Sequence, residues 1–281
     1  YLRCGRHCPT YTLHSMNPDG SDIVRLSYHE THEWQPNVTH DGMLVYTRWD
    51  YVDRDTNIAH HIWTCYPDGR NPRSPHGNYP ERRETRPWME MDIRAIPGSH
   101  KVLVIGSGHH TDQSGKLMRL NRNKGTQEEQ GLEYVAPVRA FEPVRDDYFG
   151  RQGELFQYPL PIDEDNYIVS LNPEGGPPRG AYKFRYGIYW VSSAGDRELL
   201  VYDPTVSSGQ AVPRMARIAP PVRPDGFKLE RNEGEFYVQN VYFGPGLKGV
   251  PPGTVRKLRI VALSYRAMSA GVDYNQPSSQ V

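Results

Sequence analysis

Short runs of alternating apolar and polar residues recur along the chain, and each run ends in residues that favour a turn. Residues 12–16 lead into a Pro-Asp-Gly turn that ends at Gly20, and residues 62–66 lead into the same turn, which ends at Gly69. Alternation with a period of two is typical of a half-buried strand. Asp-Gly supplies the positive φ angles of a tight hairpin, so both runs predict hairpin strands.

A second pattern precedes the later hairpin strands. A proline and a short polar turn lead into apolar runs at residues 43–47, 101–105 and 166–170, and weaker copies of the hairpin turn end at Gly125 and Gly195. Repeated units of buried strand, loop, exposed strand and turn are typical of the four-stranded blades of a β-propeller. We therefore predict an all-β fold, a partial β-propeller in which about three to four blades are visible. A β-sandwich with unrelated Asp-Gly turns is the alternative.

Within this fold we expect the aromatic side chains of Trp34, Tyr46 and Trp63 to be largely buried within or between blades. Residues 43–66 contain no Gly or Pro, but Asp and Asn residues at their centre favour turns. This segment should therefore be a strand, a loop and a strand, and not one continuous helix.

Composition narrows the class of protein. The chain has 281 residues with 26 Gly and 25 Pro, which interrupt it too often for a helical bundle. Aromatic residues reach 11%, which indicates a folded chain. Lys plus Arg (33) equals Asp plus Glu (33), and this balance argues against binding to nucleic acid. No apolar run approaches the roughly 18 residues of a membrane-spanning helix.

The blade pattern also predicts the domain organisation. We assign residues 1–212 to propeller blades, 213–226 to a proline-rich linker and 227–281 to the start of a truncated, β-rich C-terminal domain, with strand-like runs at 236–242 and 255–265. Residues 122–157 are polar and charged, and we expect a long surface loop there. Closed propellers typically need about 4–8 blades, so we expect a fragment that lacks N-terminal blades.

Three cysteines are too few for a disulfide scaffold. Cys4 and Cys8 are close enough in sequence that a bridge between them stays open, whereas Cys65 lies in a strand-like run and is expected to be a small buried hydrophobe. The chain has no Cys-x-x-Cys-His, so we expect no covalent haem on the chain itself.

Several motifs together resemble proteins related to the alpha subunit of hydrazine synthase, and the repeat units alone also resemble TolB-like propellers. The motifs that carry the resemblance lie at residues 9–16, 33–36, 46–54, 60–63, 86–89, 96–101, 237–242, 249–251 and 253–259. The resemblance implies a six-bladed propeller that precedes domains carrying c-type haem, in a periplasmic or otherwise extracytoplasmic protein.

On this resemblance, the expected role of the chain is a scaffold and docking surface for haem-bearing domains or subunits that lie beyond it. If the parent protein is an enzyme, it is expected to be a multi-haem oxidoreductase of the hydrazine synthase type, with no catalytic motif in this chain. The alternative is a stand-alone, TolB-like recognition module that binds a protein or a glycan and has no redox role.

Paired histidines are one set of candidate binding residues. His60, His61, His109 and His110 are expected in loops beside strands, where imidazole is able to bind a metal or a haem edge. Ordinary hydrogen-bonded loop histidines are the more common case. The cluster of His29, Glu30, His32 and Glu33 is likewise expected in a surface loop.

Charged and aromatic residues after the strand at 43–47 form a second candidate set, because loops on a rigid scaffold often carry binding residues. The set consists of Arg48, Trp49, Asp50, Asp53 and Arg54. The two aspartates are suited either to Ca²⁺ or, as we favour, to ion pairs with the arginines. Trp88 and Glu90 have a similar composition before the next blade. No nucleophile elbow, P-loop or dinucleotide fingerprint is present.

Overall fold

The structure is a computed structural model. It describes residues 11–28, 32–50, 59–77, 86–109, 111, 113–136, 153–176, 185–226, 228, 230–261, 264–265 and 279–280. Gly226 ends the first of two compact units, and the residues from 228 onward belong to the second.

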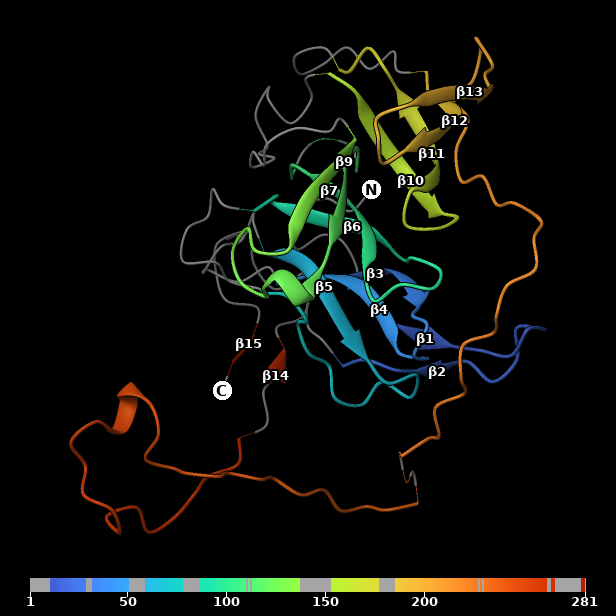
Figure 1. Ribbon diagram of the computed structural model, residues 1–281. Coiled ribbons are helices and arrows are strands. Elements are labelled where there is room, and N and C mark those ends of the chain that lie inside the picture. Colours follow the sequence, from blue (N-terminus) through green and yellow to red (C-terminus); the bar gives the residue numbers. More distant parts are fainter. Residues whose placement is uncertain are drawn as a thin grey trace. The chain divides into compact units, whose positions relative to one another are not determined.

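The first unit is built from three groups of antiparallel strands, which we name blades A, B and C (Figure 1). Blade A contains β3 (His32–Val38), β4 (Leu44–Trp49) and β5 (His60–Cys65). Blade B contains β6 (Met89–Ala95), β7 (Val102–Ser107), β8 (Gly115–Leu120) and β9 (Leu132–Ala136). Blade C contains β10 (Leu155–Pro161), β11 (Asn166–Asn172), β12 (Gly187–Ser192) and β13 (Arg197–Val201).

Consecutive blades are joined where the third strand of one blade meets the first strand of the next. Single residue pairs, His60 with Met89 and Gly115 with Phe156, link the blades into an 11-stranded sheet. Before blade A, β1 (His14–Ser15) pairs with β2 (Val24–Arg25), and Glu33 N–H donates to the Tyr11 carbonyl at 2.9 Å. The all-β, propeller-like architecture is confirmed, and the sheet does not close among the described residues.

The hairpin turns follow one geometry. Gly20, Gly69 and Gly195 donate their N–H to the residue three positions earlier at 2.9, 2.8 and 3.1 Å, and all three have positive φ. Asp19 and Asp68 are absent from the positive-φ residues, so only the glycine needs the left-handed conformation and the expectation for the Asp-Gly pair is corrected. Each aspartate instead accepts the N–H two residues ahead, at 3.0 and 3.1 Å.

The first strand of every blade carries the same kink. Gln35, Asp92 and Tyr158 have φ angles of 54°, 50° and 48°, and the strand pairing shifts register at each of them. Asp92 N–H donates to Gln35 Oε1 at 3.0 Å, and Tyr158 N–H hydrogen-bonds the Asp92 carboxylate. Each kink is thus hydrogen-bonded to the next. A β-bulge leaves a residue unpaired in the strand ladder, so its backbone N–H is able to bond to the side chain of the preceding kink.

Apolar side chains fill the space between these strands. One cluster joins blades B and C and includes Leu117, Phe156 and Val169, and a second joins blades A and B and includes Val45, Ile93 and Val104. Tyr46 is fully buried, and Trp34 and Trp63 are each less than half exposed, so the three aromatic side chains are largely buried as predicted. Among the described residues of 43–66 there are two strands and no helix, as expected.

Two expectations about individual segments are wrong. Residues 122–157 are not one surface loop, because they contain β9 and the start of β10, whose apolar positions are buried. The run at 236–242 contains no strand, since alternation alone does not make a strand where no described strand pairs with it. The described residues of the run at 255–265 form a strand only at Ser264–Tyr265, and Leu258 and Ile260 are exposed.

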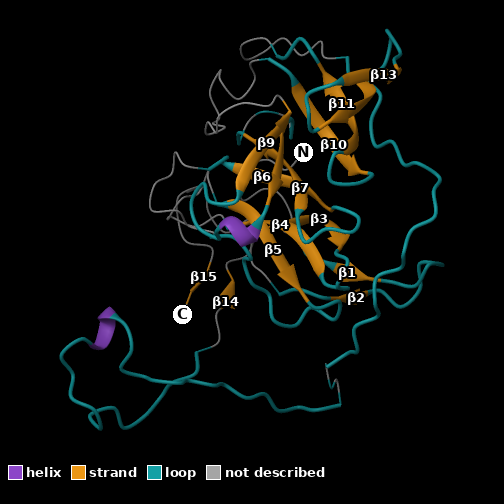
Figure 2. Ribbon diagram, viewed as in Figure 1, coloured by secondary structure: helices purple, strands orange, loops and turns teal. Residues whose placement is uncertain are grey.

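Helix is confined to two short 3₁₀ turns, η2 (Arg122–Lys124) and η3 (Pro245–Leu247), within the part of the chain that the structure describes (Figure 2). No helix among these residues is long and apolar enough to cross a membrane. In the second unit, β14 (Ser264–Tyr265) pairs with β15 (Ser279–Gln280). The assignment of 227–281 to a β-rich domain stays a prediction.

Residues 203–226 continue from blade C without regular structure. Ser208 N–H donates to the Tyr186 carbonyl at 2.7 Å, a Cβ on Gly209 would lie 3.1 Å from the Tyr158 ring, and Gln210 hydrogen-bonds the Tyr158 phenol. Further along, Gly226 N–H donates to Asp68 Oδ2 at 2.7 Å, so the segment also reaches a turn of blade A.

Candidate functional site

The candidate residues gather at one end of the strands. Residues 39–43, 96–101 and 162–165 connect the first strand of each blade to the second, and we call this the turn end. Residues 50–59, 108–114 and 173–186 connect the second strand to the third at the opposite end, which we call the loop end. The described candidates Trp49, His60 and His109 all lie at the loop end.

A row of three rings crosses blade A at the loop end. His32 of β3 pairs with Trp49 of β4, and Trp49 pairs with His60 of β5, so the three side chains share one face of the blade. The Trp49 ring stacks on His60 with centroids 4.4 Å apart and on His32 at 5.4 Å. His109 and Trp34 also contact Trp49, at 5.3 and 6.3 Å. We call these five residues the ring cluster.

The other blades do not repeat the ring cluster. At the positions of His32 and Trp49, blade B has the pair Met89 and Ser107, and blade C has the pair Leu155 and Asn172. A blade therefore forms without aromatic rings at these positions, so the rings of blade A are an addition to the scaffold.

A buried ionic cluster lies next to the ring cluster. Glu90 of β6 accepts two hydrogen bonds from Arg86 Nη2, at 2.6 Å to each carboxylate oxygen. His61 Nδ1 lies 3.5 Å from Glu90 Oε2, and His76 Nδ1 lies 3.9 Å from Glu90 Oε1. All four side chains are fully buried, and the Thr47 hydroxyl donates to the Glu90 backbone carbonyl at 2.8 Å. We call Arg86, Glu90, His61 and His76 the ionic cluster.

Charge and burial set the protonation states in the ionic cluster. Burial by itself raises the pKa of Glu90, but the Arg86 guanidinium and the two histidines outweigh it and hold that pKa well below its usual range. Burial, together with the Arg86 charge, lowers the pKa of His61 to about 4 and also lowers the pKa of His76. The resting cluster is therefore one ion pair and two neutral imidazoles.

Several donors of the ionic cluster are unsatisfied within the described structure. Arg86 Nε and Nη1 and both ring nitrogens of His61 have no hydrogen-bond partner and no contact with solvent. A buried polar group without a partner costs about 1–3 kcal/mol. Such groups are exceptional in folded proteins, and each one calls for an explanation.

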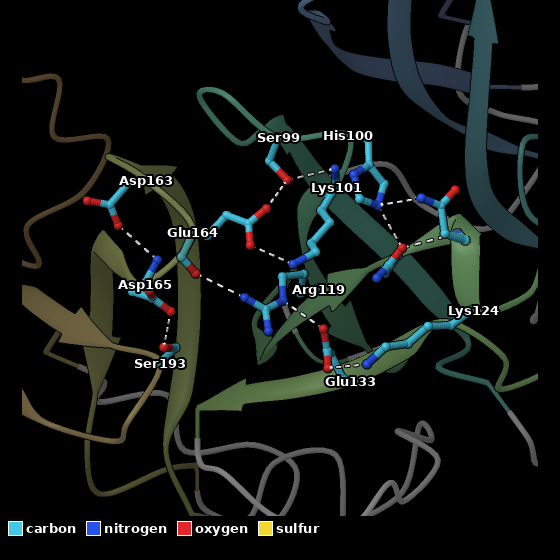
Figure 3. Close-up of polar contacts among 12 residues, drawn as sticks. Ser99, His100, Lys101, Arg119, Lys124, Glu133, Asp163, Glu164, Asp165 and Ser193 are labelled. Atoms are coloured by element: carbon cyan, nitrogen blue, oxygen red, sulfur yellow. Dashed lines mark hydrogen bonds and ion pairs between the residues drawn. The ribbon is translucent and has the colours of Figure 1, made fainter.

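At the turn end, in contrast to the ionic cluster, the charged side chains have hydrogen-bond or ion-pair partners (Figure 3). Glu164 accepts from Ser99 and lies 2.6 Å from Lys101 Nζ, while Arg119 Nε lies 2.7 Å from Glu133. The contacts of Glu164 join blade B to blade C, whereas the Arg119–Glu133 pair lies within blade B, and each named charged group has a partner of opposite charge. They stabilise the scaffold and leave no group free for a ligand.

Asp53 and Arg54 of the second candidate set lie outside the described residues, as does His110 of the paired histidines. Strand β4 extends through Arg48 and Trp49. The expectation that these two residues lie in a loop is therefore wrong. Arg48 Nε lies 2.7 Å from Asp50 Oδ1, the internal ion pair that we favoured over Ca²⁺. Trp88 is half-buried in the turn before β6.

The expectation of loop residues is wrong for His60 and His61, and for His32 and Glu33, but it is confirmed for His109. His60 and His61 are buried in β5, and His32 and Glu33 are buried in β3. Only His109 lies in a turn, and it is buried as well. In these strands His32 and His60 stack on Trp49, and His61 lies 3.5 Å from Glu90 Oε2.

Sequence reasoning missed Arg86 and His76 as site residues. Arg86 had one available signal, its four-residue spacing from Glu90, but that spacing indicates an ion pair only in a helix. His76 had no such signal in the sequence, because only the folding of the chain brings it close to Glu90.

No group of three His, Cys, Asp or Glu side chains among the described residues is arranged to hold a metal ion. Covalent c-type haem does not fit this chain either, since the sequence has no Cys-x-x-Cys-His. Cys65 is buried against Leu13 and Tyr46, and burial raises the pKa of its thiol to about 12. The thiolate form that a haem or metal needs is thus disfavoured there.

Comparisons with known proteins support a shared fold. No family model and no curated protein matches the sequence. Among solved structures, the chain is similar to "Kuenenia stuttgartiensis Hydrazine Synthase", with a TM-score of 0.50 and 19% sequence identity. The match covers 67% of this chain and 22% of that chain, so this chain spans less than a quarter of the protein it matches. At this identity the likeness shows the fold alone.

Proposed function

We propose that this chain is the propeller part of an extracytoplasmic, haem-associated redox protein related to hydrazine synthase. In this role it is a scaffold, and its loop end is the docking surface for haem-bearing domains or subunits. The haem belongs to those partners, because the chain has no residues that attach it covalently. Periplasmic localisation and the redox role of the parent are parts of the same proposal.

The observation that carries the proposal is the ring cluster at the loop end of blade A. Blades B and C form the same strands with Met89, Ser107, Leu155 and Asn172 at the corresponding positions, so the fold does not require the rings. His32, Trp49, His60 and His109 are buried, so they do not contact a partner themselves. Their stacking holds the loop end of blade A in place, and loops on a rigid scaffold often carry binding residues. The shared fold with hydrazine synthase supports the choice of a haem-bearing partner.

The first experiment tests haem content. The parent protein, purified from its source in the periplasmic fraction, should carry covalent haem in a pyridine haemochrome spectrum. The 281-residue chain expressed alone, with haem-attachment machinery present, should purify without it. A parent protein without haem would overturn the redox proposal and favour a recognition module that binds a protein or a glycan.

The second experiment tests the docking surface. Binding of the 281-residue chain to the haem-bearing part of the parent is measured by sedimentation. Trp88→Ala, at a half-buried residue beside the loop end, should weaken binding by about tenfold or more. Trp190→Ala is the matched control, because Trp190 is also half-buried but donates to Asn166 at the turn end, at 3.2 Å. Equal losses in both variants would place docking elsewhere.

A further inference from the structure

The ionic cluster has more hydrogen-bond donors than acceptors. A guanidinium carries five N–H groups, and Arg86 uses only the two of Nη2, both on Glu90. Three N–H groups on Nε and Nη1 and the N–H of His61 stay without an acceptor among the described residues. The Glu90 oxygens already accept from Arg86, and Oε2 also lies 3.4 Å from the Ile62 N–H.

A water molecule does not balance this surplus. It accepts two hydrogen bonds but also brings two O–H donors of its own, so the surplus of donors over acceptors stays the same. A small oxyanion brings acceptors only, and a planar guanidinium edge matches two oxygen atoms of such an ion. Carboxylate or nitrate is therefore the chemistry that fits the free edge of Arg86.

Charge balance then requires a proton. Arg86 and Glu90 already neutralise each other, so a bound anion leaves one buried negative charge, which is unfavourable unless it is paired. His76 Nε2 lies 2.9 Å from the Gln130 carbonyl and so carries its hydrogen. The unprotonated His76 Nδ1 lies 3.9 Å from Glu90 Oε1 and is placed to take the proton. The other charged groups that act on His76 are Arg86 and Glu128.

We propose that Arg86, His61 and His76 form a buried binding site for one small oxyanion, which is taken up together with one proton that resides on His76. The free guanidinium edge of Arg86 and the His61 ring donate to the anion, and Glu90 holds Arg86 in place. This site is independent of the docking role of the loop end, and its test uses no partner protein.

The experiment measures thermal unfolding of the 281-residue chain in sodium formate, with sodium chloride added to keep the ionic strength constant. The midpoint temperature should rise with the logarithm of formate concentration. Between pH 6 and 8, where formate stays ionised, its apparent affinity should increase tenfold for each unit that the pH falls, because one proton is bound. Nitrate should compete with ¹³C-formate for the same saturable site in NMR titrations.

Matched variants test which side chain binds the anion and which one takes up the proton. Arg86→Lys keeps the charge but loses the planar edge and should remove the formate response, whereas Arg119→Lys, at the turn end, should keep it. His76→Gln should keep some binding but lose its pH dependence, and His61→Gln should keep the dependence.

The proposal is overturned if formate gives no saturable response, if binding is independent of pH, or if Arg86→Lys responds like the wild type. If Arg86→Lys does not unfold cooperatively, the wild-type NMR titration and its pH dependence decide the question.

Discussion

The interfaces between blades A and B and between blades B and C are built on the same repeat but differ in one position. Two residues before the kink, the first strand of blade B has Glu90, whereas the first strand of blade C has Phe156. Glu90 is surrounded by Arg86, His61 and His76, but Phe156 lies in an apolar cluster with Leu117 and Val169. Both side chains are fully buried.

This difference shows that the fold accepts either solution and that the ionic cluster is not needed to join two blades. A buried ion pair is, as a rule, no more stabilising than well-packed apolar residues of similar volume. The A–B interface therefore carries charge at no evident gain in stability, which is expected of a site with a function. The following predictions exchange or remove the features that distinguish the two interfaces.

The largest effect is expected from placing a carboxylate in the apolar interface. Phe156→Glu removes a buried ring and buries an acid without a cation, and it should cost about 5 kcal/mol or more in free energy of unfolding. Urea unfolding followed by tryptophan fluorescence measures the change. Phe156→Leu is the control and should cost less than about 1.5 kcal/mol. A tolerated Phe156→Glu would mean that the two interfaces are interchangeable.

Next in size is the loss of the cation at the A–B interface. Arg86→Met leaves Glu90 buried without its partner and should cost about 3–5 kcal/mol in urea unfolding. The double variant Arg86→Met with Glu90→Met makes this interface resemble the B–C interface and should be more stable than the single variant. If the double variant is the less stable of the two, the ionic cluster is a structural requirement after all.

A pH effect of about 3 kcal/mol should distinguish the interfaces as well. The pKa of His61 is about 4 in the folded chain and 6.5 when unfolded, so between these values the unfolded chain binds the extra proton. Stability from this residue is fully present above pH 6.5 and is lost as the pH falls towards 4. Urea unfolding at several pH values, in chloride without carboxylate buffers, measures the slope.

In the same experiment, His61→Gln should flatten most of the slope, and replacement of the exposed His14 by Gln should leave it unchanged. A wild-type slope in the His61 variant would assign the effect to another group.

The smallest effect concerns the ring cluster. Trp49→Leu keeps an apolar side chain but removes stacking on His32 and His60, and it should cost about 1–2 kcal/mol in free energy of unfolding. Calorimetry of the variant, beside Trp190→Leu in blade C, measures this loss. Trp49 is fully buried whereas Trp190 is half-buried, so a loss no larger than that of Trp190→Leu would contradict the prediction.

Strands with a strong local pattern could be predicted from the sequence. The apolar runs at 43–47, 101–105 and 166–170 became β4, β7 and β11, because alternation and a preceding turn are local features. Strand β9 was missed since its polar position, Glu133, looked like part of a charged loop. Its partner Arg119 lies opposite it on β8, and only the pairing of the strands reveals that.

The ionic cluster could not be predicted from local sequence patterns, for a similar reason. His61 and Glu90 looked like exposed candidates because isolated polar residues are mostly exposed. Their burial depends on Arg86 and His76, which come together with Glu90 only after β5 and β6 meet at His60 and Met89. A sequence pattern within one blade does not predict chemistry that depends on contacts between blades.

The segment that follows blade C limits how a further blade is added to the sheet. Gln210 has a φ of 54° and hydrogen-bonds the side chain of Tyr158, so it continues the series of linked kinks that runs through Gln35 and Asp92. In repeat proteins, a terminal cap covers the last unit and keeps its apolar face from solvent. Residues 203–212 do not form such a cap, because β13 keeps Leu199, Leu200 and Val201 about half exposed. Ser208, Gly209 and Gln210 nevertheless lie against Tyr186 and Tyr158, so a further blade that continues the series of kinks has to displace them from this position.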